Sequence, residues 1–261
     1  MSIRLIAVDM DGTLLDSQKR CPDDFFPFVK EHEDIKVVIS SGRQYYKLYD
    51  QFEEAADKVV FVAENGAAVF YHDELIYSDS MKAEDAKVCL DIASKIPNTE
   101  IIMCGIDSAY MLPDCEELPS EWSKYYSRME FVDNLEDAIK KDRILKIAVF
   151  IRGHKAQEAY DNFPQMPEGI ESVLSGDSWV DIGNASVNKG KGIEILQERF
   201  GINREESMAF GDYLNDLSML RQCEESWAMV SGHEIVKKEA KHITEFGNDD
   251  NGVMRTLRQI L

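Results

Sequence analysis

The sequence predicts an α/β protein in which a doubly wound parallel sheet carries an inserted α+β domain. Short apolar runs rich in β-branched residues are typical of parallel strands buried on both faces, and helical patterns lie between them. The middle of the chain instead combines helical patterns with several strand-like runs. Polar stretches directly follow the predicted strands, which places them at the sheet edge where α/β proteins bind ligands.

The two ends of the chain read as βα units of one sheet, and the middle reads as an insert. We expect a core made of residues 1–82 and 185–261, interrupted by an inserted domain over residues 83–184. The expected core strands are residues 3–8, 36–40, 59–62 and 207–210. The expected core helices are residues 24–32, 45–55, 192–200, 214–222 and 234–241.

The expected insert has helices at 84–95 and 155–162 and strands at 100–103, 110–112, 145–152 and 179–182. Residues 67–77, with His72 and Asp73 at the turn, predict a hairpin that leads into it.

The charge of the chain limits the kinds of molecule that it is expected to bind. The 261 residues carry a formal net charge of −20, which argues against binding to nucleic acid or to an anionic membrane surface. The apolar run before Asp9 is too short for a signal peptide or a spanning helix, so we expect a cytoplasmic protein. We also expect it to be a monomer or a weak homo-oligomer. No CxxC spacing occurs, and reduced thiols are expected at all the cysteines, namely Cys21, Cys89, Cys104, Cys115 and Cys223.

The first polar stretch, VDMDGTLLDS, places Asp9 and Asp11 directly after an apolar strand. Extended geometry would put both carboxylates on one side, and such crowding calls for a cation or a proton. Asp9 could attack phosphorus, while Asp11 protonates the leaving oxygen and later takes a proton from water. Gly12 would allow a sharp turn, and a simple Asp-Gly turn is the alternative interpretation.

The second stretch, VVISSGR, again runs from a strand into small hydroxyl residues. Ser41 could donate a hydrogen bond to a phosphate oxygen, with Gly42 and Arg43 beside it. Two other interpretations stay open, because Ser41 could cap the helix near Tyr45 and Arg43 could form a surface ion pair.

The third stretch, NKGKG at residues 188–192, precedes a predicted helix. A lysine there could neutralise charge on the nucleophile and on the phosphoryl group. Lys189 and Lys191 compete for this role, and a solvated loop lysine is the common alternative.

The fourth stretch, FGDYLNDLSML, brings Asp212, Asn215 and Asp216 to a strand end and a helix start. Asp212 and Asp216 are four positions apart and share a face if the backbone is helical. Helix capping explains each residue singly but not the cluster. Mg²⁺ prefers oxygen ligands and keeps several waters, so Asp9 and a carboxylate here would form a site, with Asn215 and Asp216 holding waters.

Together these stretches resemble the haloacid dehalogenase-like hydrolases. Within that superfamily, the pattern is similar to the Cof-type sugar-phosphate phosphatases, which have a Rossmann-like core and a large α/β cap. The resemblance rests on DMDGTLL, SSGR, ENGA at residues 64–67, NKGKG, GDYLND and the ending HITEFGNDDNGVMRTL. The insert matches mainly by position and size, and Asn184 and Ser186 stand where the family often has proline and glycine.

The resemblance implies a role for each matching position. Asp9 would be the nucleophile, Asp11 the acid/base, and Ser41 and Lys189 the phosphate-binding pair. Besides this pair, we expect Gly42, Arg43 and Asn215 to contact the substrate. The Mg²⁺ ligands would be Asp9, the Asp11 carbonyl and Asp212, supported by Asn215 and Asp216.

We therefore expect a magnesium-dependent phosphatase that hydrolyses small phosphomonoesters, with sugar phosphates favoured, through an aspartyl phosphate. Its partner would be a small phosphorylated metabolite. Two alternatives remain, namely a phosphomutase or phosphotransferase that uses the same intermediate, and a non-catalytic metabolite-binding protein.

Overall fold

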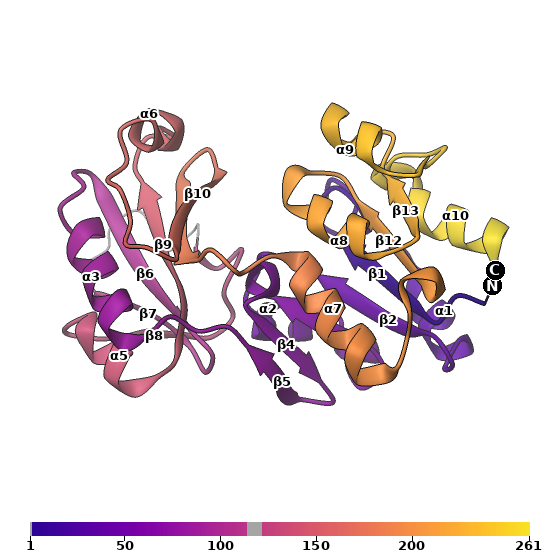
Figure 1. Cartoon of the computed structure of the whole chain (residues 1–261), viewed down its shortest axis with the longest axis horizontal. Helices are drawn as coiled ribbons and strands as arrows, with labels where there is room; N and C mark the ends of the chain where they lie inside the picture. Colours follow the sequence, from indigo (N-terminus) through magenta and orange to yellow (C-terminus); the bar gives the residue numbers. More distant parts are fainter. Residues whose placement is uncertain (1, 114–121) are drawn as a thin grey trace. The chain divides into compact units, whose positions relative to one another are not determined.

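The computed structural model describes residues 2–113 and 122–261, and it divides the chain into two units (Figure 1). The first unit combines Met1–Tyr77 with Asn188–Leu261, and the second is Ser78–Val187. The sequence placed these divisions after residues 82 and 184. Among the cysteines, Cys115 lies outside the described residues, and no disulfide joins any two of the described cysteines.

The first unit is built on one mixed sheet with β1 near its middle. The strand order is β14-β13-β12-β1-β2-β3-β4-β5, with parallel pairing from β14 to β3 and antiparallel pairing between β3 and β4. The strands are β1 (Leu5–Asp9), β2 (Lys36–Ser40), β3 (Val60–Ala63), β4 (Ala68–Tyr71), β5 (Glu74–Ser78), β12 (Ser207–Gly211), β13 (Glu225–Ala228) and β14 (His242–Ile243). The expected doubly wound core is confirmed.

Helices cover both faces of this sheet. Successive side chains of a strand point to opposite faces, so both sets of side chains are buried. Leu5 and Val38 pack in one cluster with Ile193 and Met219 of two helices, whereas Phe61 on the other face contacts the aromatic rings of Tyr45 and Phe52. The helices are α1 (Phe25–Glu31), α2 (Tyr45–Gln51), α7 (Lys189–Phe200), α8 (Leu217–Gln222), α9 (Glu234–Glu239) and α10 (Gly252–Ile260).

Helix α7 begins three residues earlier than the sequence pattern predicted. Asn188 caps it by accepting a hydrogen bond from the Lys191 backbone N–H at 3.0 Å, so Lys189 lies in the first turn rather than in a loop. The glycines that suggested a loop instead allow close packing. A Cβ atom on Gly192 would lie 2.6 Å from Cγ1 of Val62.

Two further expected helices are each interrupted. The pattern at 45–55 gives α2 and then a 3-10 turn at Glu53–Ala55, and the pattern at 214–222 gives a 3-10 turn at Leu214–Asp216 and then α8. The sequence did not predict β13, β14 or α10, because the strands are short and the helix follows a polar stretch.

The second unit has its own sheet, with the strand order β10-β11-β9-β6-β7-β8. Its strands are β6 (Thr99–Gly105), β7 (Ala109–Met111), β8 (Met129–Phe131), β9 (Ile144–Ile151), β10 (Ile170–Gly176) and β11 (Trp179–Asn184). Its helices include α3 (Ala83–Ala93), α5 (Glu136–Lys141) and α6 (Ala156–Tyr160). The helices pack on one face, and an aromatic-rich cluster that includes Phe150 and Trp179 occupies the other. The α+β character is as predicted, although β8, β10 and α5 were not.

The predicted hairpin before the insert is confirmed as β4 and β5. His72 and Asp73 have φ values of 51° and 60°, which match the left-handed turn favoured in two-residue hairpins. The chain then enters the second unit at Asp79, whose carboxylate accepts hydrogen bonds from the side chains of Asn184 and Ser186 at 2.6 and 2.5 Å. The entering and leaving segments are therefore bound to each other.

No helix in the described part of the chain is both long enough and apolar enough to cross a membrane.

Replacing Gly192 with alanine should destabilise the first unit. Overpacking costs about 1–3 kcal/mol, and the 2.6 Å contact with the buried Val62 places this substitution in the upper part of that range. The better helix propensity of alanine returns only about 1 kcal/mol, so a net loss of about 1–2 kcal/mol remains. We expect the melting temperature to fall by roughly 2–8 °C, measured by circular dichroism. Lys191→Ala, at a half-exposed position of the same helix, is the control and should shift it little. An unchanged or raised melting temperature for Gly192→Ala would contradict this account of the packing.

Candidate active site

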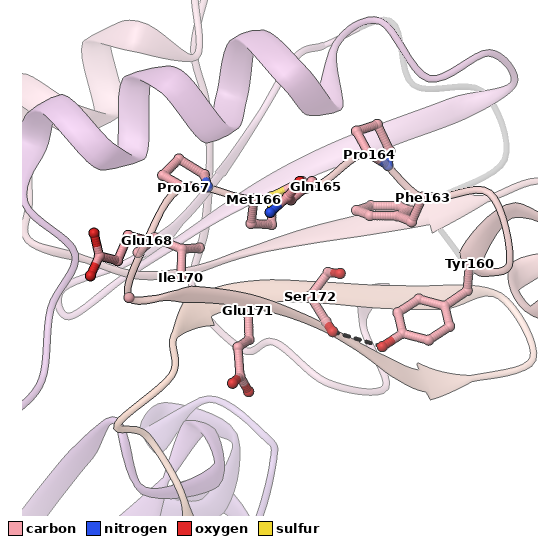
Figure 2. A pocket seen from close by; sticks show the side chains of 11 residues that line it. Tyr160, Phe163, Pro164, Gln165, Met166, Pro167, Glu168, Ile170, Glu171 and Ser172 are labelled. Atoms are coloured by element: carbon pink, nitrogen blue, oxygen red, sulfur yellow. Dashed lines mark hydrogen bonds between the residues drawn. The ribbon is translucent and has the colours of Figure 1, made fainter.

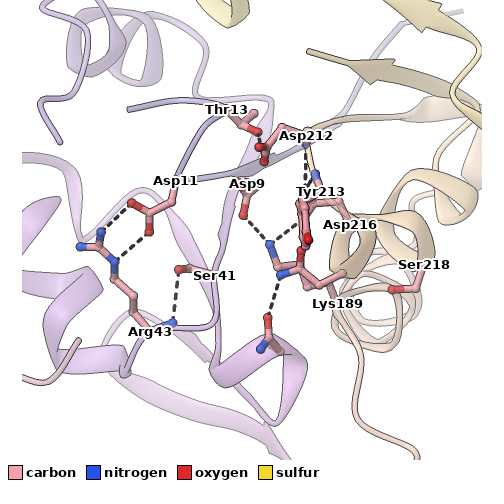
Figure 3. Close-up of polar contacts among 12 residues, drawn as sticks. Asp9, Asp11, Thr13, Ser41, Arg43, Lys189, Asp212, Tyr213, Asp216 and Ser218 are labelled. Carbon is pink, nitrogen blue, oxygen red and sulfur yellow. Dashed lines mark hydrogen bonds and ion pairs between the residues drawn. The ribbon is translucent and has the colours of Figure 1, made fainter. Parts of the chain in front are cut away.

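Asp9 is the last residue of β1, and its side chain is buried where three segments converge (Figure 3). The extended backbone ends there, because Gly12 adopts a φ of 91° in the following turn. That turn passes close to the loop after β12, since a Cβ atom on Gly12 would lie 2.5 Å from Oδ2 of Asp212. Only glycine fits this position, both by conformation and by space.

Asp9 and Asp11 bind different cationic side chains. The repulsion that the sequence predicted between the two carboxylates is therefore offset by a separate partner for each. Asp9 binds Lys189, whereas Asp11 binds Arg43 and Lys19. Burial together with the charges of Asp216 and Asp212 raises the pKa of Asp9 to about 8, against the lowering effect of Lys189. The like charges that oppose Asp9 therefore come mainly from the loop after β12.

Lys189 is the buried cation of the site. Its side chain has no exposed surface, and its Nζ atom contacts Asp9 and lies 2.6 Å from Oδ1 of Asp216. Burial disfavours its charge, but the two carboxylates outweigh that effect and raise its pKa above the usual value. Lys191 instead forms a half-exposed ion pair with Glu194 at 2.6 Å. The structure thus brings Lys189, and not Lys191, to Asp9.

The loop after β12 is held by Asp216. Its Oδ2 atom accepts hydrogen bonds from the backbone N–H groups of Asp212 and Tyr213 at 2.9 and 3.1 Å. Thr13 donates a hydrogen bond to Oδ1 of Asp212 at 3.2 Å. Burial and the charge of Asp216 raise the pKa of Asp212 to about 6. Asp216 therefore links Lys189 to the loop that presents Asp212.

Asp11 forms a two-pronged ion pair with the buried Arg43. The guanidinium donates to its two oxygens at 2.9 and 2.6 Å (Figure 3). The Nζ atom of Lys19 lies 2.7 Å from Oδ1 of Asp11. Burial acts against the charged form, but the two cations outweigh it and hold the pKa of Asp11 below its usual range. Asp11 is thus a carboxylate in this structure, and Arg43 is not a surface residue.

Ser41 is buried at the end of β2, next to Gly42 and Arg43. Its Oγ atom accepts a hydrogen bond from the Arg43 N–H at 3.3 Å, and its own N–H donates to Val62 at 2.9 Å. It does not cap α2, whose N-cap residue is Gln44.

The acidic cluster fits a divalent cation. Oxygen atoms of Asp9, Asp212 and Asp216 lie within 4.8 Å of one another. Besides burial, the charge of Asp216 raises the pKa of both Asp9 and Asp212, and the charge of Asp212 also raises that of Asp9. A cation would relieve this repulsion. Carboxylate oxygens are ligands that Mg²⁺ prefers. Both oxygens of Asp216 are already bound within the protein, to Lys189 and to backbone N–H groups, so Asp9 and Asp212 are better suited than Asp216 to contact a cation directly.

The structure therefore gathers the residues singled out in the sequence at one edge of one unit. Asn215 lies in the same loop and donates a hydrogen bond to Oδ1 of Asn65 at 3.2 Å. Sequence reasoning assigned no role to Asn65, Lys19 or Thr13. Thr13 and Asn65 stand inside quoted motifs, but Lys19 has no local signal, because only folding brings its loop to Asp11.

A separate pocket lies in the second unit (Figure 2). It is formed by the segment from Tyr160 to Ser172, and the tyrosine hydroxyl donates to the Ser172 carbonyl at 2.9 Å. Its described lining includes Glu168 and Glu171 and no cationic side chain. The pocket is therefore poorly suited to an anionic ligand.

Comparison with known proteins agrees with this geometry. The family model for haloacid dehalogenase-like hydrolases matches residues 6–257. The 5-amino-6-(5-phospho-D-ribitylamino)uracil phosphatase YbjI of Escherichia coli strain K12 is 32% identical, over 100% of this chain and 97% of its own length. The phosphatase YcsE of Bacillus subtilis strain 168, which carries the same enzyme name, is 25% identical over 99% of this chain and 96% of its own.

The solved structure of the HAD subclass IIB sugar phosphatase BT4131 shares the fold. It has a TM-score of 0.79 at 23% identity, and the match covers 98% of both chains. The chain therefore belongs to the haloacid dehalogenase-like hydrolases and is a phosphatase.

Proposed function

We propose that this phosphatase is magnesium-dependent and hydrolyses small phosphomonoesters of the sugar-phosphate class through an aspartyl phosphate on Asp9. The observation that carries the proposal is the Asp9 carboxylate, buried at a strand end between a cation and two further carboxylates. The substrate class is supported by YbjI and YcsE, both named for a substrate with a phosphorylated ribityl chain.

In the first half-reaction, an oxygen of Asp9 attacks phosphorus while the bond from phosphorus to the leaving oxygen breaks. The proton that the leaving oxygen needs comes from Asp11. In the second half-reaction, water attacks the phosphorus of the aspartyl phosphate and gives its proton to Asp11. The bond between phosphorus and Asp9 then breaks, which releases inorganic phosphate and restores both carboxyl groups.

The ion pairs of Asp11 suit the second half-reaction directly. With Arg43 and Lys19 beside it, Asp11 is a charged base in the free protein. To act first as an acid it must gain a proton, and the negative charge of an arriving phosphate group favours that gain. The same phosphate group attracts Arg43, which weakens the hold of the guanidinium on Asp11.

Lys189 and Ser41 serve the phosphoryl group. The buried ammonium of Lys189 offsets negative charge at Asp9 as phosphate approaches, and the Ser41 hydroxyl can donate to a phosphate oxygen. Asp9, the Asp11 main-chain carbonyl and Asp212 would hold Mg²⁺, with Asn215 and Asp216 supporting that arrangement. When bound, Mg²⁺ supplies positive charge that stabilises the transferring phosphoryl group.

Phosphate release from a panel of phosphorylated metabolites, measured with and without Mg²⁺, tests the proposal. The panel should include sugar phosphates, sugar-alcohol phosphates and the substrate for which YbjI and YcsE are named. Adding a free sugar as a competing acceptor distinguishes hydrolysis from transfer, because a phosphotransferase would yield a new phosphate ester in place of inorganic phosphate. Absence of release from every ester would overturn the proposal.

Asp9→Asn should abolish turnover while the protein stays folded, because the amide keeps the volume of the side chain but is not a nucleophile. Released inorganic phosphate is the measurement. Substantial release by a folded Asp9→Asn protein would exclude Asp9 as the nucleophile.

Melting temperatures of the metal-free wild-type and Asp9→Asn proteins, measured as a function of pH, show whether the variant is folded and test the raised pKa of Asp9. Since the pKa of Asp9 is raised to about 8 in the folded state, the folded wild type retains a proton that the unfolded chain loses from about pH 4 upward. Wild-type stability should therefore fall between about pH 4 and pH 8, whereas the variant lacks this group. The melting temperature of the variant should rise relative to wild type across that range.

Asp11→Asn should slow turnover and allow the phosphoenzyme to accumulate when the leaving group is a good one, such as 4-nitrophenolate. Such a leaving group needs little protonation, whereas the attacking water still needs a base. Acid quenching with a ³²P-labelled ester measures the trapped aspartyl phosphate. Steady-state turnover equal to wild type would remove Asp11 from this role.

Chelation with EDTA should abolish phosphate release, Mg²⁺ should restore it, and Ca²⁺ should bind without restoring it. Ca²⁺ takes six to eight ligands and often binds both oxygens of a carboxylate, which would occupy the oxygen of Asp9 that attacks phosphorus. A thermal shift measures binding of each ion, and released phosphate measures turnover. Equal rates with Ca²⁺ and Mg²⁺ as the sole metal would contradict this explanation.

A further inference from the structure

The segment after β3 has an unusual backbone. Glu64, Asn65 and Gly66 have φ values of 49°, 57° and 103° in succession. Two consecutive non-glycine residues in the left-handed region are costly, and such strain persists only where surrounding structure enforces it. The segment follows β3, which pairs in parallel with β2 and so ends at the same sheet edge as Ser41.

Backbone hydrogen bonds fix this segment against the neighbouring loop. The N–H of Asn65 donates to the Ser41 carbonyl at 2.9 Å, and the N–H of Glu64 donates to the Arg43 carbonyl at 3.1 Å. On its other side the segment meets the start of α7, because a Cβ atom on Gly66 would lie 2.2 Å from the Asn188 carbonyl oxygen. The strained segment therefore lies between the Ser41 loop and the residue that precedes Lys189.

The side chain of Asn65 lies against Gly42. A Cβ atom on Gly42 would be 3.0 Å from Nδ2 and 3.2 Å from Oδ1 of the amide. The Oδ1 atom accepts a hydrogen bond from Asn215 at 3.2 Å, which orients the amide. Within the part of the chain that the structure describes, Nδ2 donates no hydrogen bond. An oriented donor is thus available directly beside the Ser41–Gly42 backbone.

We propose that Asn65 is a further phosphate-binding residue, whose Nδ2 donates to an oxygen of the phosphoryl group while Asn215 holds its Oδ1. This inference rests on the proposed function, because it places the phosphate at Ser41 and Lys189. It accounts for the left-handed backbone, which brings the amide over Gly42. Asn65 would then recognise the phosphoryl group common to all substrates and not the leaving group.

The test compares Asn65→Gly and Asn65→Asp with wild type. Glycine accepts the left-handed backbone but lacks the amide, and aspartate keeps the size and replaces the donor with a carboxylate. For each protein we measure kcat and KM with 4-nitrophenyl phosphate and one sugar phosphate, and the affinity for inorganic phosphate by calorimetry. Loss of a hydrogen bond to a charged group should weaken phosphate binding at least about tenfold and raise KM similarly for both substrates.

The matched control is Asn251→Gly. Asn251 also has a left-handed backbone, with a φ of 57°, but it precedes α10 and contacts none of the site residues described above. This variant should keep wild-type kinetics and phosphate affinity. Melting temperatures of all the variants report whether each one is folded.

The outcomes separate this inference from the proposed function. Unchanged phosphate affinity and KM in a folded Asn65→Gly protein would overturn the role of Asn65 while phosphatase activity stood. A lower kcat with unchanged phosphate affinity would also overturn it, because that result indicates a purely structural role. If wild type released phosphate from no ester, the proposed function would fail, but weaker phosphate binding by both variants would still support Asn65 as a phosphate ligand. If wild type bound no inorganic phosphate, the inference would be wrong.

Discussion

The site depends on one buried cation. Lys189 lies between Asp9 and Asp216 with no exposed surface, and these carboxylates raise its pKa against the lowering effect of burial, which keeps it charged. In return, its charge is the main attraction that opposes the mutual repulsion of the acidic cluster. Removing Lys189 would leave Asp9 and Asp216 buried together without their cation, which is strongly destabilising. Chemistry and local stability are therefore coupled at this position.

Short, close contacts between loops allow this arrangement. Gly12 approaches Asp212 and Gly66 approaches Asn188 so closely that a Cβ atom would collide, and Gly42 approaches Asn65 so closely that a Cβ atom would make a tight contact. Each contact joins segments far apart in sequence. The parallel strands bring these segments to one edge, and the absence of side chains lets the loops approach closely enough for their polar groups to share a site.

The inserted second unit does not separate the site residues from one another, because they all belong to the first unit. It enters after β5, at the end of the strand order of the first sheet, so it interrupts no ladder between the strands that carry the site. Asp79 binds Asn184 and Ser186, and thereby fastens the entering and leaving segments to each other. The predicted chemical residues all belong to the first unit, while the second has its own sheet and hydrophobic clusters. Such separation allows the insert to vary without disturbing Asp9.

The sequence by itself determined the class of fold, the buried strands around β1 and the identity of the polar residues at their ends, because apolar runs and strand-end carboxylates are local patterns. It left open whether Lys189 or Lys191 belongs to the site, since both lie beside glycines and only burial distinguishes them. Tertiary structure alone decided the partners: Asp11 pairs with Arg43 and Lys19 rather than opposing Asp9, and Asn65 reaches Gly42 through a left-handed backbone. Long-range pairing and backbone strain depend on the whole fold, so no short stretch of sequence encodes them.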